Sequence, residues 1–549
     1  DGPAAIAAHF GDWVIGGTDR NGLRPMRYTH TTDGLLIAGS ETGMVHVDET
    51  KIAECGRLGP GEMIAVNLKE GRVIHDAELK TALADQQNWA GWTTRAKSIN
   101  ALLANARTQQ DDRPDDEVRR RRQLMSGWSM EDMELILAPM ASTGKEAVGS
   151  MGDDAPLAVL SGKYRGLHHF FRQNFSQVTN PPIDSLRERH VMTLRTRLGN
   201  LGNILDESPE QCEHLVLDSP VVTNAEWHAI KDHLGDKAVE IDCTFGVDDG
   251  PEGMKAALDR IRSHAEQAVR GGCEHVMLSD RNSASDRVPL PMVLAAGAVH
   301  SHLVRQQLRT FTSVNVSSGE CLDVHHFAVL IGVGATTVNA YAAEWTIVER
   351  QQKGLLEEVS LSKAVANYRK AIEDGLLKIM SKMGISVIAS YRGGYNFEAL
   401  GLSRSLVAEF FPPMSSRISG IGLNGIQARL MALHKQAYDA NLSYLPVGGF
   451  FRFRKSGERH AFDGQIIHAM QHACDTGSYQ SWKKYTAMVA RQGPVNLRDL
   501  MDFERKYEPI SVETVESITD IRKRLVSPGI SLGALSPEAH ETLSIAMNR

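Results

Sequence analysis

The chain has 549 residues, a formal net charge of -7 and a hydrophobic content of 42%. This length predicts roughly two to four domains with cores of ordinary size. The acidic balance argues against a nucleic-acid or membrane-surface protein, because phosphate binding needs a basic face, and no apolar run is long enough to cross a membrane.

The first eighty or so residues contain short apolar runs separated by Gly-Asp, Asn-Gly and Asp-Gly turns. This spacing predicts an antiparallel β-meander, which would be one part of a sandwich with partner strands upstream. For Asp19 to Arg24 we expect a tight turn in which arginines brace a carboxylate, rather than a binding site. Cys55 lies in a turn-like context without a base, so we do not expect it to act as a nucleophile.

Helical patterns follow from residue 85 to residue 149. A helix is expected from Asp85 to Asn105, and the segment from Met130 to Met140 carries an apolar stripe that is typical of a core helix. The basic run Arg119 to Arg122 stands beside several acidic residues. Mixed charge of this kind favours a solvated helix or linker that binds nothing.

The stretch from Ser150 to Arg189 opens with a polar loop, Ser150 to Asp154. The apolar run Pro156 to Leu160 is predicted to be a short buried strand or the floor of a pocket. Three aromatic residues are then expected on roughly one helical face, which must end before the Asn-Pro-Pro sequence at 180–182: Phe170, Phe171 and Phe175.

Beyond residue 213, apolar runs of three to five residues alternate with helical segments. The pattern predicts a parallel sheet buried on both faces, and hence a complete or incomplete TIM-like (β/α) barrel, with a doubly wound sheet as the alternative. The expected strands are 215–217, 239–241, 276–278, 314–316, 328–331 and 387–389.

Several polar or glycine-rich motifs of the chain are candidate sites. Gly332 and Gly334 lack the third glycine of a dinucleotide loop, so strand-to-helix packing is favoured. Asp280, Arg281 and Asp286 follow a strand at its carboxyl end and are the best candidates for a polar pocket there. Two histidine pairs are interpreted as structural, because neighbours on a strand point to opposite faces: His168 with His169, and His325 with His326.

After residue 410 the sequence predicts a hairpin in which Phe451 and Phe453 alternate with arginines, and a helix from Ile466 to Gln492. The last segment predicts a strand from Ile530 to Leu532, and then a helix that Ser536 caps.

The six cysteines are far apart and include no C-x-x-C pair, so neither a zinc site nor an iron-sulfur centre is predicted from them. We expect six buried thiols in a reducing cytoplasm. The chain starts without methionine at Asp1 and stops at Arg549 just inside a predicted helix. We therefore expect a fragment that is cut at both ends.

Four segments carry a resemblance to one family. SMGDDAPLAVLS followed by QNFSQVTNPPIDSLRE is similar to the start of the central domain of the large chain of bacterial, NADPH-type glutamate synthase. DGPAA, TDRNGLRPMRY and AGSETG resemble the closing half of its class II glutamine amidotransferase domain. HHFAVLIGVGATTVNAY resembles its flavin-free central barrel, and SPGISLGALSPEAHETLSIAMNR resembles the start of its FMN-binding synthase domain.

The resemblance implies an α/β chain with a central TIM-like barrel domain. Part of a class II amidotransferase β-sandwich would precede this barrel, and the first βα unit of a second, FMN-binding barrel would follow it. The implied boundaries are 1–85 for the end of the amidotransferase domain, 86–409 for the central domain, 410–509 for a connector and 510–549 for the start of the FMN domain.

The function implied by the resemblance is the synthesis of two L-glutamate from L-glutamine and 2-oxoglutarate, with ammonia channelled between a glutaminase site and an FMN synthase site. The family protein carries FMN and a 3Fe-4S cluster, although we expect neither to bind this fragment. A small chain carrying FAD and the NADPH site is the implied partner, with ferredoxin in its place in a related subgroup, and a cytoplasmic homo-oligomer is expected.

The resemblance also implies site residues. The family's nucleophile is an amino-terminal cysteine that lies outside this chain, so no catalytic residue is expected here. Ser531, Gly533, Ala534 and Ser536 would form a flavin-facing loop, and Ser150, Met151 and Gly152 would form a channel or flavin-facing loop. Tyr395 departs from the family's small-residue pattern and would narrow any ammonia passage there.

Two alternatives stay open on the sequence. One is a non-catalytic scaffold, either a fragment or a paralogue, that binds no cofactor. The other is an independent barrel enzyme whose pocket would depend on Asp280 and Arg281.

Overall fold

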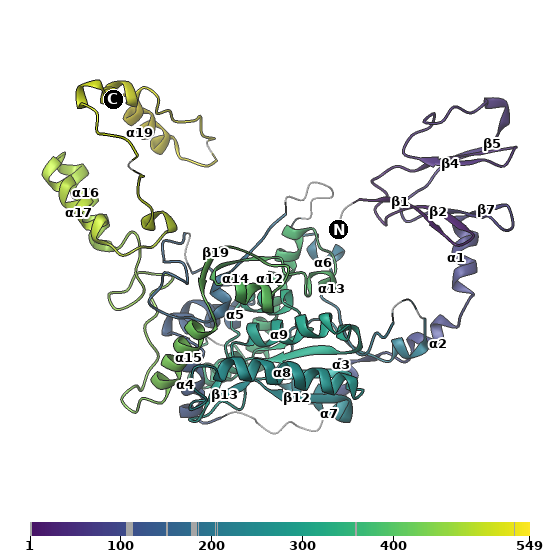
Figure 1. Cartoon of the computed structure of the whole chain (residues 1–549), viewed down its shortest axis with the longest axis horizontal. Coiled ribbons are helices and arrows are strands. Elements are labelled where there is room, and N and C mark those ends of the chain that lie inside the picture. The colour runs from purple at the N-terminus through teal and green to yellow at the C-terminus, as the bar shows by residue number, and fades with distance from the viewer. Residues whose placement is uncertain are drawn as a thin grey trace. The chain divides into compact units, whose positions relative to one another are not determined.

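The computed structural model describes residues 3–105, 114–149, 152–176, 184, 186–203, 205, 207–356, 359–504, 506–531 and 533–549. They form two compact units, Asp1–Asn496 and Leu497–Arg549, which are treated separately below. The mixture of helices and several sheets confirms the predicted α/β class (Figure 1).

The amino-terminal part of the first unit is built from antiparallel strands, as predicted. One sheet has the order β1-β2-β6-β7 and the other has the order β4-β3-β5. Every side chain of β1 is exposed, including Ile6 and Phe10. This strand therefore presents apolar side chains that the described residues leave uncovered. The strands are β1 (Ala5–Phe10), β2 (Trp13–Thr18), β3 (Arg27–Thr31), β4 (Leu36–Gly39), β5 (Ile52–Arg57), β6 (Met63–Asn67) and β7 (Arg72–His75).

Helices predominate between residues 76 and 143. They are α1 (Asp76–Ala84), α2 (Trp89–Thr93), α3 (Ile99–Asn105), α4 (Asp116–Met125) and α5 (Ala138–Thr143). A π-helical stretch, Asp132–Leu137, runs directly into α5. The apolar stripe from Met133 to Met140 is buried in the main hydrophobic core, which confirms its prediction as a core helix.

The centre of the first unit is a four-stranded parallel sheet, with the order β12-β14-β16-β17. Its strands are β12 (Ala238–Asp242), β14 (His275–Ser279), β16 (Ser313–Ser317) and β17 (Thr337–Asn339). Val276 pairs with Val239 on one side and with Val314 on the other. Helices α8 (Gly253–Arg270), α9 (Met292–Arg305) and α10 (Val324–Gly332) connect these strands, and α11 (Tyr341–Gln352) follows the last of them. Figure 1 shows α8 and α9 lying against the sheet.

Further strands form separate small sheets. Their orders are β10-β11-β8, β13-β15 and β19-β18-β9. Among the described residues the strands do not close into a barrel, so only the parallel α/β arrangement of the prediction is observed. The strands are β8 (Lys97–Ser98), β9 (Phe171–Gln173), β10 (Thr196–Leu198), β11 (Leu215–Leu217), β13 (Thr244–Gly246), β15 (Arg287–Pro289), β18 (Phe397–Leu402) and β19 (Ser415–Ile421).

Two of the predicted strands are wrong. Residues 328–331 lie inside helix α10, and Val387 makes a single bridge to Thr193 before the short helix α13 (Ile388–Tyr391) begins. Helix α10 is buried almost all round, and an apolar run of this kind has no periodicity that separates a buried helix from a buried strand. The predicted strands at 215–217, 239–241, 276–278 and 314–316 are confirmed.

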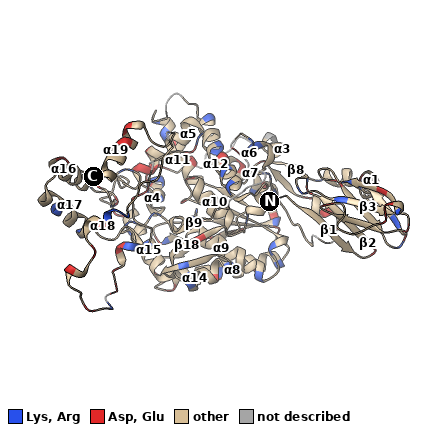
Figure 2. Ribbon diagram, turned by 90° about the horizontal axis from the view of Figure 1, so that it is seen from above, with Lys and Arg blue, Asp and Glu red and all other residues tan. Residues whose placement is uncertain are grey.

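The remaining helices of the first unit are α6 (Glu188–Val191), α7 (Asn224–Leu234), α12 (Leu361–Met383), α14 (Arg404–Phe410), α15 (Leu423–Ala437), α16 (Gly464–Thr476) and α17 (Tyr479–Arg491). Lysine and arginine are interspersed with acidic residues along α12, as Figure 2 shows. Instead of the single helix predicted from Ile466 to Gln492, two helices pack together and reverse at Gly477, which has a φ of 59°. The predicted aromatic hairpin is absent from the described residues 448–462, which are irregular.

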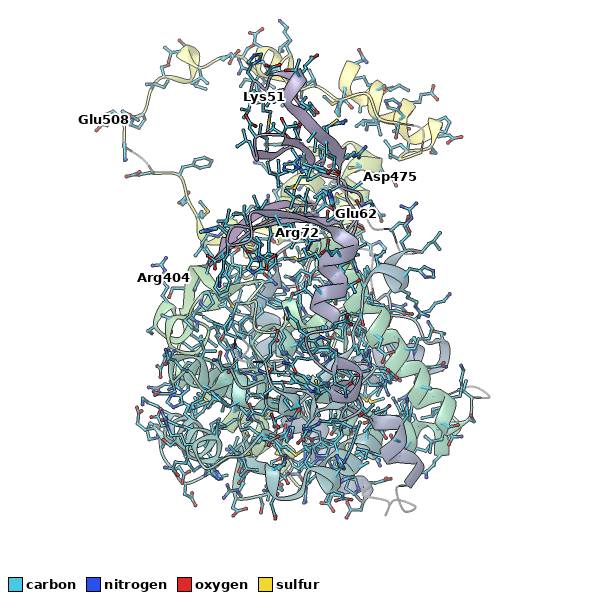
Figure 3. The ribbon with its side chains drawn as sticks, turned by 90° about the vertical axis from the view of Figure 1, so that its right-hand side faces the viewer. Lys51, Glu62, Arg72, Arg404, Asp475 and Glu508 are labelled. Atoms are coloured by element: carbon cyan, nitrogen blue, oxygen red, sulfur yellow. The ribbon has the colours of Figure 1, made fainter. Side chains whose placement is uncertain are left out.

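In the second unit, residues around Glu508 form an extended stretch (Figure 3), and the helices are α18 (Ile518–Arg522) and α19 (Pro537–Asn548). The predicted strand is not formed at Ile530 or Ser531, and Leu532 lies outside the described residues. No described helix in either unit combines the length and the apolar character that membrane crossing requires.

Candidate functional site

A cavity of about 520 Å³ opens beside the loop that begins at Gly152. Residues from 152–172, 323–325 and 450–458 line it. Residues 155–160 make turns rather than a strand, and Pro156 and Ala158 lie on the cavity wall. The alternative of a pocket floor is therefore confirmed, and the strand is wrong. Gly152 lines the cavity, whereas Ser150 and Met151 lie outside the described residues.

The segment 450–458 is held against the cavity by buried carboxylates. Glu131 accepts hydrogen bonds from three consecutive backbone N–H groups, those of Phe450 at 2.5 Å, Phe451 at 3.2 Å and Arg452 at 2.9 Å. A carboxylate that accepts several backbone N–H bonds is well satisfied even when buried. The backbone at Phe451 therefore turns around the Glu131 carboxylate and does not form the predicted strand, in which aromatic residues and arginines would alternate.

Arg165 also lines the cavity and contacts the same segment. Its guanidinium carbon lies 3.9 Å from the centroid of the Phe450 ring, and its Nη2 donates to the Asp132 carboxylate at 3.1 Å. Lys163 donates from Nζ to the Ser456 carbonyl at 2.8 Å. Arg165 and Lys163 therefore hold the segment 450–458 at the cavity.

Histidines from two distant segments meet behind the cavity. The ring centroids of His168 and His326 are 4.3 Å apart, and His169 and His325 line the cavity itself. The residues lie on a 3-10 turn, Leu167–Phe170, and on α10, so the argument from alternating strand positions was wrong. Among the described residues no group of three or more such side chains could hold a metal ion.

Burial is the largest cause that holds the pKa of His168, His169 and His326 well below the usual value. The neighbouring histidines, and Arg165 in the case of His169 and His326, further disfavour a positive charge. His326 Nδ1 accepts a hydrogen bond from the Leu322 N–H at 3.0 Å, as a neutral imidazole requires. Uncharged imidazoles therefore stand behind one wall of the cavity.

Asp280 and Arg281 lie at the carboxyl end of β14, as predicted, but they do not form an open pocket. Asp280 is buried and accepts from the Gly319 N–H at 2.9 Å, and burial raises the pKa of its carboxyl group. The Arg281 guanidinium lies 4.2 Å from the Tyr341 ring centroid and donates to Asn339 Oδ1 at 3.1 Å. Asp286 is exposed and does not join this group.

Arg122, on α4, completes this packed end and was not predicted. Its guanidinium donates to the carbonyls of Asp280 at 3.0 Å, Arg281 at 2.9 Å and Ser283 at 3.1 Å. Arg119 and Arg122 are buried, so the prediction of a solvated basic run was wrong at these two positions. Because protein side chains occupy this sheet edge, the structure does not favour an independent barrel enzyme with a pocket there.

The glycines at 332 and 334 serve packing, as predicted. A Cβ at Gly334, where φ is 123°, would overlap the His300 ring, and a Cβ at Gly332 would overlap Phe397. Tyr395 is buried and has a φ of 49°, and its N–H donates to the Gly332 carbonyl at 3.0 Å. The tyrosine thus packs on the glycine turn, and its narrowing of a passage stays a prediction.

The loop expected to face a flavin does not enclose a site within the described residues. Ser531, Gly533, Ala534 and Ser536 are exposed, and a Cβ at Gly533 would meet no atom within 4 Å. Ser536 instead caps α19 by accepting from the Ala539 N–H at 3.3 Å. The predicted cap is confirmed, but these residues alone do not fit the demands of a flavin cradle.

The turn at Asp19 is tight, as predicted. The Gly22 N–H donates to the Asp19 carbonyl at 3.0 Å, and Gly22 has a φ of 60°. Arg20, however, donates to the Val191 carbonyl at 3.1 Å rather than bracing a carboxylate. The expectation of six buried thiols was also wrong, because burial needs tertiary cover that spacing does not reveal: Cys243 and Cys321 are buried, Cys212 and Cys273 are half-buried, and Cys55 and Cys474 are exposed.

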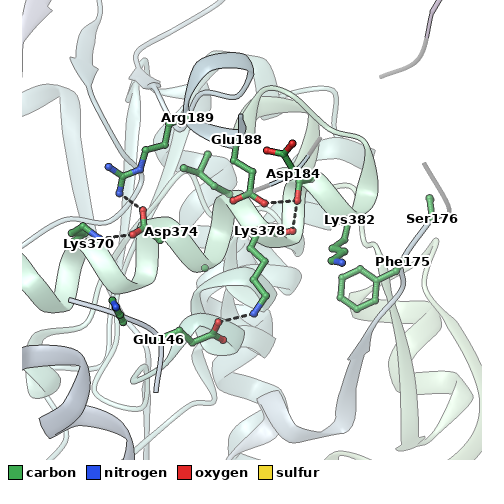
Figure 4. A pocket seen from close by; sticks show the side chains of 14 residues that line it. Glu146, Phe175, Ser176, Asp184, Glu188, Arg189, Lys370, Asp374, Lys378 and Lys382 are labelled. Carbon is green, nitrogen blue, oxygen red and sulfur yellow. Dashed lines mark hydrogen bonds and ion pairs between the residues drawn. The ribbon is translucent and has the colours of Figure 1, made fainter. Parts of the chain in front are cut away.

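A larger cavity, of about 1060 Å³, lies along α12 (Figure 4). Its charges are largely paired, because Lys378 contacts Glu146 at 3.1 Å and Lys370 contacts Asp374 at 2.6 Å. Arg189 also pairs with Asp374. The pairs with Glu146 and Arg189 join α12 to neighbouring segments, whereas the pair of Lys370 with Asp374 lies within the helix.

Models of known protein families match three parts of the chain. Residues 121–403 match the glutamate synthase central domain, residues 1–92 match class-II glutamine amidotransferases, and residues 460–549 match the conserved region in glutamate synthase. The chain therefore belongs to the glutamate synthase family. This membership fits the glutamate synthase interpretation, and it does not favour the alternative of a non-catalytic scaffold.

Relatives in the family are similar along the whole chain. The chain is 61% identical over 551 residues to the glutamate synthase [NADPH] large chain of Azospirillum brasilense, and 38% identical over 552 residues to that of Bacillus subtilis. It is also 38% identical to the ferredoxin-dependent glutamate synthase of Pyropia yezoensis. Each alignment covers all of this chain but only 36% of the relative.

Among solved structures, the recombinant flavin-binding domain of baker's yeast flavocytochrome b2 is 11% identical, with a TM-score of 0.27. The match covers 51% of this chain and 90% of that one. A score of this size does not assign a fold.

Proposed function

We propose that this chain is the middle part of a glutamate synthase large chain, which makes two L-glutamate from L-glutamine and 2-oxoglutarate. The three family matches, in the order amidotransferase, central domain and synthase region, support this assignment. The 61% identity to an NADPH-type large chain favours NADPH as the source of electrons.

In this proposal residues 1–85 end the amidotransferase domain, 86–409 form the central domain, 410–509 connect, and 510–549 begin the FMN domain. The central domain is an open relative of a (β/α) barrel. Its parallel order β12-β14-β16-β17, with a helix after each strand, supports that relationship.

The central domain's task is to carry ammonia between two active sites. Ammonia must stay unprotonated to act as a nucleophile, so its path must be shielded from bulk water. The observation that carries this proposal is the cavity at Gly152, one wall of which is formed by His169 and His325. Since burial keeps His169 and its neighbour His168 uncharged, they are not a source of protons for ammonia.

The complete protein would also hold FMN and a 3Fe-4S cluster, and a small chain with FAD and an NADPH site would deliver electrons. FMN, once bound, would supply the reduction of the aminated 2-oxoglutarate. Ser531, Gly533, Ala534 and Ser536 would contribute one loop to its site, and the rest of that site would come from outside this chain. A cytoplasmic homo-oligomer is proposed for the assembly.

Blocking the cavity tests this function. A Cβ at Gly152 meets no atom within 4 Å, so Gly152→Phe in the complete enzyme adds bulk at the cavity without a backbone clash. Gly162→Phe is the matched control, because a Cβ at Gly162 is equally unhindered and this residue does not line the cavity.

We expect Gly152→Phe to hydrolyse more glutamine than it converts to glutamate, while synthesis from added ammonium salt persists. Gly162→Phe should keep the two rates equal. Equal rates in both variants would contradict the place of this cavity on the ammonia path.

A further inference from the structure

Asp154 joins the cavity loop to the segment that leads into α16. Its carboxylate accepts hydrogen bonds from His460 Nδ1 at 2.7 Å and from the Phe462 N–H at 3.0 Å. Its backbone carbonyl accepts from the Ala461 N–H at 2.9 Å. Three hydrogen bonds thus converge on one residue of the loop.

His460 faces an acceptor at each ring nitrogen. Nδ1 lies against the Asp154 carboxylate, and Nε2 lies 2.7 Å from the Gly449 carbonyl oxygen. Since neither oxygen can donate a proton, both nitrogens must carry hydrogen, and the ring is an imidazolium. Its side chain is only 6% exposed, so the positive charge depends on these two partners.

The same segment holds both ends of the α16–α17 hairpin. Gln492, just after α17, donates from Nε2 to the His460 carbonyl at 3.1 Å. Arg459 donates from Nη2 to the carbonyls of Leu160 at 3.1 Å and Pro494 at 3.3 Å. The Ser161 hydroxyl, on the loop that lines the cavity, donates a hydrogen bond to the Glu458 carboxylate. The base of the hairpin is therefore fastened to the loop that lines the cavity.

We propose that Asp154 and His460 are positioning residues that hold the cavity loop against the base of the α16–α17 hairpin, and that the contact loosens when the imidazolium loses a proton. The contact itself does not depend on the proposed function, but its effect on the reaction does. That effect rests on the match of residues 460–549 to the synthase region of the family. The contact would then set the alignment of the ammonia path with the region that uses ammonia.

The charged surroundings of His460 determine the direction of its pH response. Burial lowers the pKa of His460, but the hydrogen bonds to the Gly449 carbonyl and the Asp154 carboxylate outweigh burial and raise that pKa. Burial likewise raises the pKa of Asp154, but the hydrogen bonds from His460 and the Phe462 N–H outweigh burial and lower it. The contact is therefore strongest below the raised pKa of His460 and weakens as the pH rises through it, because a neutral ring keeps one N–H and can no longer donate to both Asp154 and Gly449. The groups that face the ring or share its small cavity are Asp154, Glu131, Glu458, Arg454, Lys455, Arg459 and Asp463.

Hydrogen exchange in the complete enzyme tests the contact itself. His460→Gln and Asp154→Asn should each speed exchange of the amides at 461 and 462 by about tenfold, the loss expected for one charge-assisted hydrogen bond. In the parent, exchange of these amides should rise more steeply than intrinsic base catalysis alone predicts as the pH rises through the raised pKa of His460. His472→Gln, at an exposed histidine of α16, is the control and should change neither.

The coupling of glutamine hydrolysis to glutamate formation is then measured between pH 6 and 9. We expect the parent's coupling to fall as the pH rises, and coupling in His460→Gln to be low and independent of pH. Unchanged amide exchange in both His460→Gln and Asp154→Asn would overturn the positioning contact, whether or not the cavity lies on the ammonia path. Faster exchange with unchanged coupling would keep the contact and overturn the place of the loop on that path.

Discussion

Arg122→Met tests whether a buried guanidinium holds the carboxyl end of the central sheet together. Methionine keeps much of the length of the arginine side chain but removes its donors to the carbonyls of Asp280, Arg281 and Ser283. A hydrogen bond to a charged group contributes about 1.5–3 kcal/mol, although losses at one side chain are not additive. Breaking a buried charged contact typically costs about 3–5 kcal/mol, which we expect for the free energy of unfolding.

The matched control is Arg121→Met, one residue earlier on α4. The Arg121 side chain is 35% exposed, pairs with Glu117 and lies 4.8 Å from the Tyr438 ring centroid. A partly exposed ion pair and cation–π contact together predict a loss of about 1 kcal/mol. Neither substitution touches the cavity, so stability is the only quantity that should change.

Urea unfolding followed by tryptophan emission measures both losses. Trp345 is buried and lies 5.5 Å from the Arg281 guanidinium, so its emission contributes a signal from this end of the sheet. With a urea m-value of about 3 kcal/mol/M, the Arg122→Met midpoint should fall by about 1 M or more, and the Arg121→Met midpoint by about 0.3 M. Equal midpoints for the two variants would refute the reasoning.

Three further predictions concern pH, packing and flavin. Burial raises the pKa of Glu320 to about 8, so the parent's stability should fall as the pH rises from about 5 through 8, and Glu320→Gln should flatten this fall in urea titrations. Gly334→Ala should destabilise by about 3 kcal/mol or more because of its φ of 123° and the His300 ring, whereas Gly162→Ala should stay within about 0.5 kcal/mol in the same titrations. Adding FMN to the 549-residue chain should leave flavin fluorescence unquenched, because the 531–536 loop is exposed, and quenching would count against our description of that loop.

Three of the four strands of the central sheet, β12, β14 and β16, were predictable because their apolar runs are short, whereas β17 was not predicted. Every residue of β14 and β16 is buried, and a parallel sheet covered by helices needs this composition. The same composition in α10 led to a wrong strand, because a helix buried on all sides also lacks a polar face. Closure of the sheet depends on pairing between distant segments, which local periodicity does not specify.

The charged residues show where local patterns fail. Arg122 was expected to be solvated, yet its acceptors lie 158 or more residues further along the chain. Asp154 belongs to a loop that the sequence marks as polar, but its partner His460 is 306 residues away. Only the floor of the cavity beside Gly152 was predictable. Another part of the cavity wall comes from Phe450 and its neighbours, which lie far away in the sequence. A charged side chain is buried only where a partner compensates its charge, and that partner can be identified only in the folded structure.

Isotope competition in the complete enzyme tests the central claim most directly. Glutamine labelled with nitrogen-15 in its amide is supplied together with excess unlabelled ammonium, and the label in newly formed glutamate is measured by mass spectrometry. If the region around Gly152 lines a closed path, the parent should retain nearly all of the label, and Gly152→Phe should lose it to the unlabelled pool while Gly162→Phe retains it. Retention of the label in Gly152→Phe to the same extent as in the parent would contradict the account.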